Sequence, residues 1–123
     1  MLQGRILAES LRVGCDIRVP DLRIVRIARE DVSGSAAAGQ PETWTLLDVE
    51  APDRAADELA AALAAGLADD RGWYADFRVG DEHVVVFPGR VFRYLMGDES
   101  GRRAAVEHGR AVGVPDHQLD WGD

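Results

Sequence analysis

The side chains with the greatest chemical potential in this sequence surround one hairpin. Tyr74, Asp76 and Arg78 alternate along one run, and His83 opens the next run after a short gap. Alternate residues of a strand point to one face, and paired strands bring such side chains together. A few polar groups bordered by valines are typical of a small-molecule pocket. We therefore predict a candidate ligand-binding site here, whereas the alternative is an ordinary pair of opposite charges on a solvated sheet face.

Other reactive side chains lack the spacing that catalysis or metal binding requires. His83, His108 and His117 share no helical i, i+4 spacing, so we expect no metal ion and no other cofactor. Cys15 is followed by an acid instead of an activating base, and no serine lies in a nucleophile elbow. The sequence thus predicts no catalytic residue, which favours a non-catalytic protein over an enzyme without deciding between them.

The charge of the chain favours some partners and argues against others. The 123 residues carry 22 acids and 14 basic residues, all of them arginine, for a net charge of -8. Nucleic-acid binding needs a basic surface that neutralises phosphates, so no nucleic-acid partner is expected. An acidic surface can steer a basic protein partner, although it also serves solubility alone.

Composition also predicts the compartment. The single Cys15 cannot form an internal disulfide, and no N-terminal stretch has the pattern of a signal peptide. No run approaches the roughly 20 apolar residues that span a bilayer. We expect a cytoplasmic protein without a membrane partner.

The strongest local pattern lies after Pro52, where Leu59, Leu63 and Leu67 recur at helical spacing among alanines. A second helix is expected over 99–112, with Asp98 or Ser100 as N-cap. Leu119 and Trp121 are expected to fold back onto the core. The expected strands cover residues 22–28, 43–50, 72–79 and 83–87, and residues 2–13 favour a strand weakly over a helix.

These elements predict one α+β domain over residues 1–123. We expect an antiparallel sheet of about 4–6 strands with two helices packed on one face, in a ferredoxin-like or related arrangement. In 83–87 the run Val84–Val86 places apolar side chains on both faces of the sheet. The second face is therefore expected to be covered by other strands, by a ligand or by a second subunit. One hypothesis is a homodimer that stacks its sheets through the face of Tyr74, Asp76 and Arg78.

The Pro88-Gly89 pair separates two apolar runs. Proline cannot donate to a ladder, and glycine tolerates a positive φ. Because a type II turn splays hairpin strands, we expect a kink or bulge that carries one chain direction onward.

No string in the sequence resembles a family whose function could be carried over. The function expected is a small acidic protein that acts through protein contacts, by self-association or by binding a basic partner, as an inhibitor or immunity-type protein does. The alternative is a small-molecule binding protein or an enzyme of the dimeric α+β barrel type, with its pocket near the hairpin residues.

Overall fold

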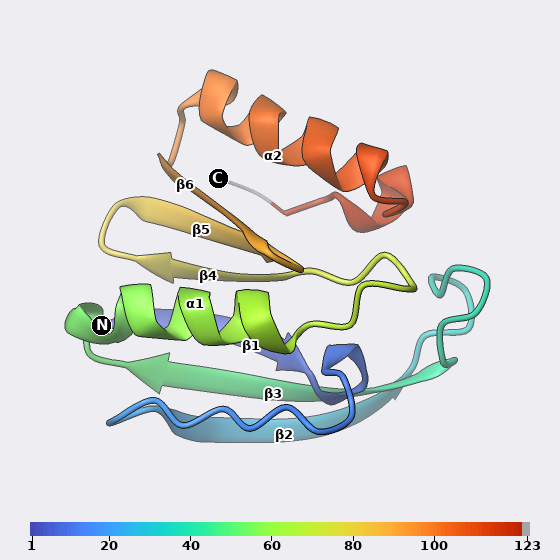
Figure 1. The fold of residues 1–123 in the computed structure, drawn as a ribbon, viewed down its shortest axis with the longest axis horizontal. Coiled ribbons are helices and arrows are strands. Elements are labelled where there is room, and N and C mark those ends of the chain that lie inside the picture. The colour runs from blue at the N-terminus through green and yellow to red at the C-terminus, as the bar shows by residue number, and fades with distance from the viewer. Residues whose placement is uncertain (122–123) are drawn as a thin grey trace.

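Six strands form one antiparallel sheet in the order β2-β3-β1-β4-β5-β6. The structure is a computed structural model that describes residues 1–121 (Figure 1). The strands are β1 (Leu2–Leu7), β2 (Arg23–Asp31), β3 (Thr43–Ala51), β4 (Ala75–Val79), β5 (Glu82–Phe87) and β6 (Arg90–Leu95). The helices are α1 (Ala56–Gly66) and α2 (Glu99–Ala111), with short 3-10 turns η1 (Ala8–Ser10), η2 (Asp53–Ala55) and η3 (Asp116–Gln118).

The N-terminal strand β1 lies in the middle of the sheet. It pairs antiparallel with β3 on one side and with β4 on the other, so β3 and β4 run in the same direction. A connection between two strands of the same direction must cross over, and α1 makes that crossing. The leucines that predict this helix, Leu59 and Leu63, are fully or almost fully buried against the sheet.

The two helices pack on opposite faces of the sheet, which corrects the prediction that both lie on one face. Val84 and Val86 belong to the core cluster beneath α1, whereas Val85 and Phe87 belong to the cluster formed with α2 and the C-terminal segment. Neighbouring residues of a strand point to opposite faces, so the two clusters lie on the two sides of β5. The physical reason is the doubly apolar β5, because one helical layer would leave Val85 and Phe87 in water.

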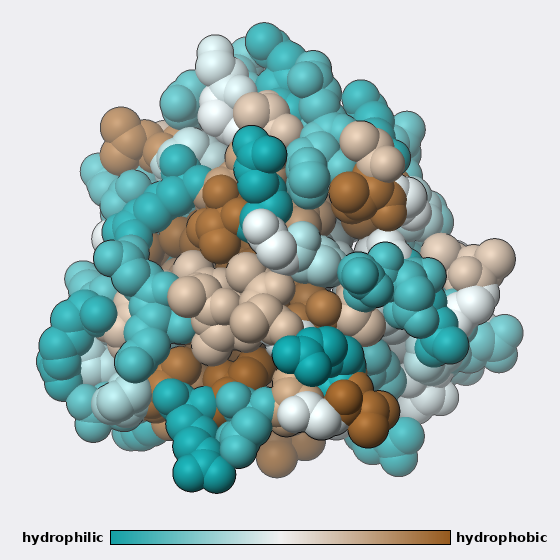
Figure 2. Space-filling model, in the orientation of Figure 1, coloured by the Kyte–Doolittle hydropathy of each residue, from teal (hydrophilic) through white to brown (hydrophobic). Residues whose placement is uncertain are grey.

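The α+β class of the prediction is confirmed by the six-stranded sheet and the two helices. A ferredoxin-like arrangement is not confirmed, since a β-α-β-β-α-β order needs a strand after the second helix and none follows α2 up to residue 121. Neither helix within residues 1–121 is long and apolar enough to cross a membrane. On the α1 side, Figure 2 shows pale and brown apolar patches at the centre of a largely hydrophilic surface.

Pro88 and Gly89 form the turn of the β5–β6 hairpin, so the predicted kink is wrong. Phe87 faces Arg90 across the turn, and Gly89 has a φ of 72°. The Gly89 N–H donates to the carbonyl of Ala64 on α1 at 2.9 Å. This bond to the end of α1 anchors the turn, and that tertiary contact is not visible in the local sequence.

α2 begins as predicted, with Asp98 as its N-cap. The Asp98 carboxylate accepts hydrogen bonds from the backbone N–H groups of Ser100 and Gly101. The segment after the helix turns back, and Leu119 and Trp121 are both buried, which confirms their predicted return to the core. This return places Trp121 beside the hairpin.

Candidate functional site

The structure brings the four hairpin residues to one face of the sheet, the face that carries α2. Arg78 lies directly opposite His83 in the β4–β5 ladder, and Asp76 is diagonal to His83. His83 Nε2 and Asp76 Oδ2 are 2.7 Å apart. His83 is fully buried, whereas the Asp76 side chain is 34% exposed. The buried histidine therefore holds Asp76 from inside the protein, while Asp76 and the exposed Arg78 reach solvent.

A chain of hydrogen bonds continues from Asp76 into the core. The Tyr94 hydroxyl lies 3.2 Å from His83 Nδ1, and Trp121 Nε1–H donates to that hydroxyl at 2.7 Å. Because indole can only donate, the Tyr94 oxygen accepts from Trp121. When the Tyr94 hydroxyl donates to His83 Nδ1, His83 carries its proton on Nε2 and donates to Asp76. The chain satisfies buried polar groups and holds Asp76 in one position.

Tyr74 forms an apolar wall next to Asp76. Its ring packs against Phe87 and Trp121 at centroid distances of 5.8 and 5.3 Å, and its hydroxyl donates to the carbonyl of Gln118. Burial raises the pKa of the Tyr74 phenol well above its ordinary value, and the nearby carboxylates of Asp76 and Asp120 add to the effect. Tyr74 therefore presents a neutral aromatic surface at physiological pH.

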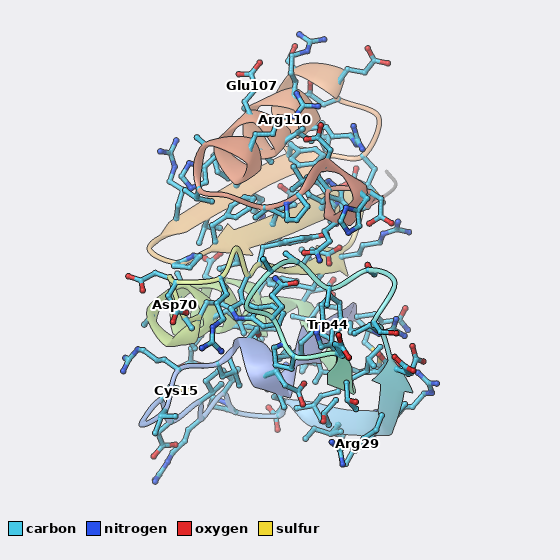
Figure 3. All side chains as sticks on the ribbon, turned by 90° about the vertical axis from the view of Figure 1, so that its right-hand side faces the viewer. Cys15, Arg29, Trp44, Asp70, Glu107 and Arg110 are labelled. Carbon is cyan, nitrogen blue, oxygen red and sulfur yellow. The ribbon has the colours of Figure 1, made fainter. Side chains whose placement is uncertain are left out.

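A groove runs over the half of this face that α2 leaves uncovered. It consists of two adjoining cavities that share Arg5, Tyr74, Asp76 and Asp120, and the smaller has a volume of about 330 Å³. Trp44 on β3, labelled in Figure 3, lines the smaller cavity. The groove is thus built from β1, β2, β3, β4 and the C-terminal segment, which are distant in sequence.

Carboxylates outnumber arginines in the groove lining. Its acids are Glu30, Asp48, Glu50, Asp76 and Asp120, and its arginines are Arg5 and Arg78.

Some of these charges are compensated within the sheet. Asp48 binds Arg5 at 2.7 Å and Arg26 at 3.3 Å, and Glu50 binds Arg23 at 3.4 Å. The hydrogen bonds from Arg5 hold the pKa of Asp48 below its ordinary range, and those from Arg26 act in the same direction. The side chains of Asp48 and Glu50 are therefore held in place along the groove by these ion pairs.

Two other acids form no ion pair with an arginine within residues 1–121. Asp120 makes no hydrogen bond or ion pair there, whereas Asp76 binds His83 and lies opposite Arg5, whose positive charge acts on it without a direct bond. Both lie beside the Tyr74 ring. An aromatic surface with two adjacent carboxylates suits a cationic group, through charge and through attraction to the ring face.

The apolar residues of β5 on this face are covered within the monomer. Val85 and Phe87 pack against Ala105 of α2 and against Leu119. The feature that motivated a dimer stacked through Tyr74, Asp76 and Arg78 therefore has an intramolecular explanation.

The remaining predicted side chains lie apart from the groove or at its rim. Cys15 is in the loop between η1 and β2, and His117 Nε2 lies 2.7 Å from the carbonyl of Ser35. His108 packs between Phe87 and Phe92, and burial lowers its pKa, with a smaller effect from Arg90. No group of three or more metal-ligating side chains within residues 1–121 is arranged to hold an ion.

Sequence reasoning missed the parts of the site that come from other strands. Arg5 and Asp48 lie opposite each other on β1 and β3, and Arg5 also faces Asp76 on β4. For these parts, the sequence indicated only that Trp121 folds back onto the core, and this places the neighbouring Asp120 at the site. No family model, curated protein or solved structure matches this chain.

Proposed function

We propose that this protein binds a basic partner protein through the groove opposite α1, as an inhibitor or immunity-type protein does. The observation that carries the proposal is the pair of carboxylates, Asp76 and Asp120, which form no ion pair with an arginine within residues 1–121 and lie beside the neutral ring of Tyr74. An arginine side chain of the partner fits this surface, because its guanidinium can bind a carboxylate in two places and stack on a ring.

The charge of the whole chain supports the same class of partner. A net charge of -8 attracts a basic protein over long range and speeds association at low ionic strength. The groove then supplies the specific contacts, while Asp48 and Glu50 are already neutralised by arginines of this chain. We further propose that the interaction takes place in the cytoplasm, as the single cysteine favours.

A hexa-arginine peptide tests the proposal directly. Isothermal titration calorimetry at low and moderate salt should show binding that weakens with salt. Asp120→Asn removes one exposed charge pair, which is worth about 0.2–1 kcal/mol, so the affinity should fall about 1.4- to fivefold. Asp69→Asn is the matched control, since Asp69 is an exposed aspartate beside Ala64 and Ala65 of α1 and, like Asp120, forms no ion pair within residues 1–121. Equal effects of the two variants, or no binding at all, would contradict a specific role for the groove.

A second candidate function is small-molecule binding in the smaller cavity, alone or as part of an enzyme. Its volume of about 330 Å³ is within the range of ligand sites, and Trp44 and Tyr74 line it together with polar groups. Native mass spectrometry of freshly purified protein separates the two functions. A retained stoichiometric small molecule supports this candidate, whereas ligand-free protein that binds hexa-arginine supports the first.

A further inference from the structure

The strand β2 (Arg23–Asp31) ends the sheet with an open edge. It pairs with β3 on one side, and within residues 1–121 no backbone hydrogen bond joins its other side to another segment. Just beyond it, the Val32 N–H donates to the Glu42 carbonyl, toward β3. Because backbone groups alternate in direction along a strand, those of Asp31, Arg29 and Ile27 point away from β3. These outward donors and acceptors form a template for another strand.

Three large apolar side chains of this edge are exposed between its charged residues. Ile24, Val25 and Ile27 are 54%, 51% and 65% exposed. Natural edge strands are commonly protected by charged side chains, by proline or by short length. β2 has nine residues and no proline, and its protection consists of charges of both signs, which a second strand of complementary charge can pair. Only a bulge between Ile24 and Arg26 interrupts it, which leaves the regular stretch 26–31 open.

The charges of the regular stretch complement a second copy of themselves. It begins with Arg26 and ends with Glu30 and Asp31. In antiparallel pairing about a twofold axis at Ala28, Arg26 of each copy lies opposite Glu30 of the other, and both side chains are on the same face. Opposite charges in directly opposed positions stabilise strand pairs, and this register forms that pair twice.

The same register also satisfies the backbone and the apolar residues. It places Ile27 opposite Arg29 of the other copy, and these are residues whose backbone groups point outward, so they can exchange hydrogen bonds. The two Ile27 side chains become diagonal neighbours and are shielded by the aliphatic stems of Arg29. Figure 3 shows Arg29 on β2 at the outer edge of the molecule.

We propose that two copies of this chain associate through their β2 strands, antiparallel about Ala28, to form one continuous sheet. This interface uses the sheet edge, so it differs from stacking of sheet faces. It shares Glu30 with the lining of the groove, but it does not require that the groove binds a basic partner.

The test is sedimentation velocity over protein concentrations from about 1 to 100 μM. The wild-type chain should show a monomer–dimer equilibrium in this range. Ile27→Lys places a lysine opposite Arg29 of the other copy at two symmetric positions, and the dissociation constant should rise at least about tenfold. Adding Arg29→Glu turns each repulsion into an attraction, so the double variant should return to within about threefold of the wild type.

Leu95→Lys is the matched control, because Leu95 is 56% exposed on β6, at the opposite edge of the sheet. This variant should dimerise like the wild type. The proposal is overturned if the wild type remains monomeric at 100 μM, if Leu95→Lys weakens the dimer as much as Ile27→Lys, or if Arg29→Glu fails to restore it. If Arg29→Glu restores dimerisation of the Ile27→Lys variant, misfolding is excluded as the reason why Ile27→Lys weakens the dimer.

Discussion

Replacement of Gly101 by alanine tests how closely α2 approaches the sheet. A Cβ atom at this position would lie 2.4 Å from the Cβ and 2.8 Å from the Cγ of Tyr94. Carbon atoms in contact are ordinarily about 3.5–4.0 Å apart, so the added methyl group would overlap by more than about 1 Å. Tyr94 cannot turn aside, since its Cβ is fixed by the backbone of β6 and its hydroxyl accepts from Trp121. The first turn of α2 must therefore move outward.

Two opposing effects decide the sign of the stability change. Alanine is favoured over glycine in a helix by at most about 1 kcal/mol, and by less near a helix end. Overpacking of a well-packed contact costs about 1–3 kcal/mol, and here the displacement also disturbs the hydrogen bonds of Tyr94. The clash should win, and Gly101→Ala should lose about 1–2 kcal/mol of stability, which corresponds to a fall in Tm of roughly 4–10 °C.

Urea denaturation followed by tryptophan fluorescence measures the change. Gly66→Ala is the matched control, because Gly66 is the last residue of α1 and its nearest neighbours, Ile17 and Cys15, would lie 3.5 and 3.6 Å from the new Cβ. That contact is ordinary, so Gly66→Ala should leave stability unchanged or raise it by up to about 1 kcal/mol. A Gly101→Ala variant as stable as the wild type would refute the close packing of α2 on β6.

Two further predictions concern the polar contacts of the site. Tyr94→Phe removes the hydroxyl between Trp121 and His83 and leaves both ring nitrogens buried without that partner. The free energy of unfolding, measured by urea denaturation, should fall by about 2–4 kcal/mol. A fall below about 0.5 kcal/mol would show that these hydrogen bonds are unimportant for stability. Arg5→Gln should raise the pKa of Asp48 toward its ordinary value of 3.8, as carboxyl NMR titration can show. Since the folded pKa is the lower one, Asp48 stabilises the fold above about pH 4 and this contribution is lost as the pH falls. The variant should therefore differ most from the wild type above that pH, and an unchanged titration would contradict the role of Arg5.

Much of the local structure is predictable because short-range physics produces it. Leucines at helical spacing form the buried stripe of α1, and Asp98 caps α2 through its own backbone neighbours. The alternation from Tyr74 to Arg78 places those side chains on one face, as strand geometry requires. Apolar residues on both faces of β5 indicated that each face is covered, although not by which element.

The candidate site is predictable only in part, because its walls come from segments that are far apart in the chain. The contact between Asp76 and His83 follows from the β4–β5 hairpin. Arg5 and Asp48 lie in the same site because β1 is inserted between β3 and β4. No local pattern encodes that insertion. Pairing of distant strands depends on the total burial of the sheet, which is a property of the whole chain.

The glycines of α2 show the same division. Taken alone, Gly101 and Gly109 weaken a helix, and the sequence predicts no more than that. In the structure they allow α2 to approach Tyr94 and Phe87. The sequence by itself thus determined both helices, most of the strands, the cap of α2 and the side-chain faces of the β4–β5 hairpin, since these depend on neighbours a few residues away. Only the tertiary structure decided which face each helix covers, which strand joins the groove and why these glycines are needed, because each depends on contacts between residues that are distant in the chain.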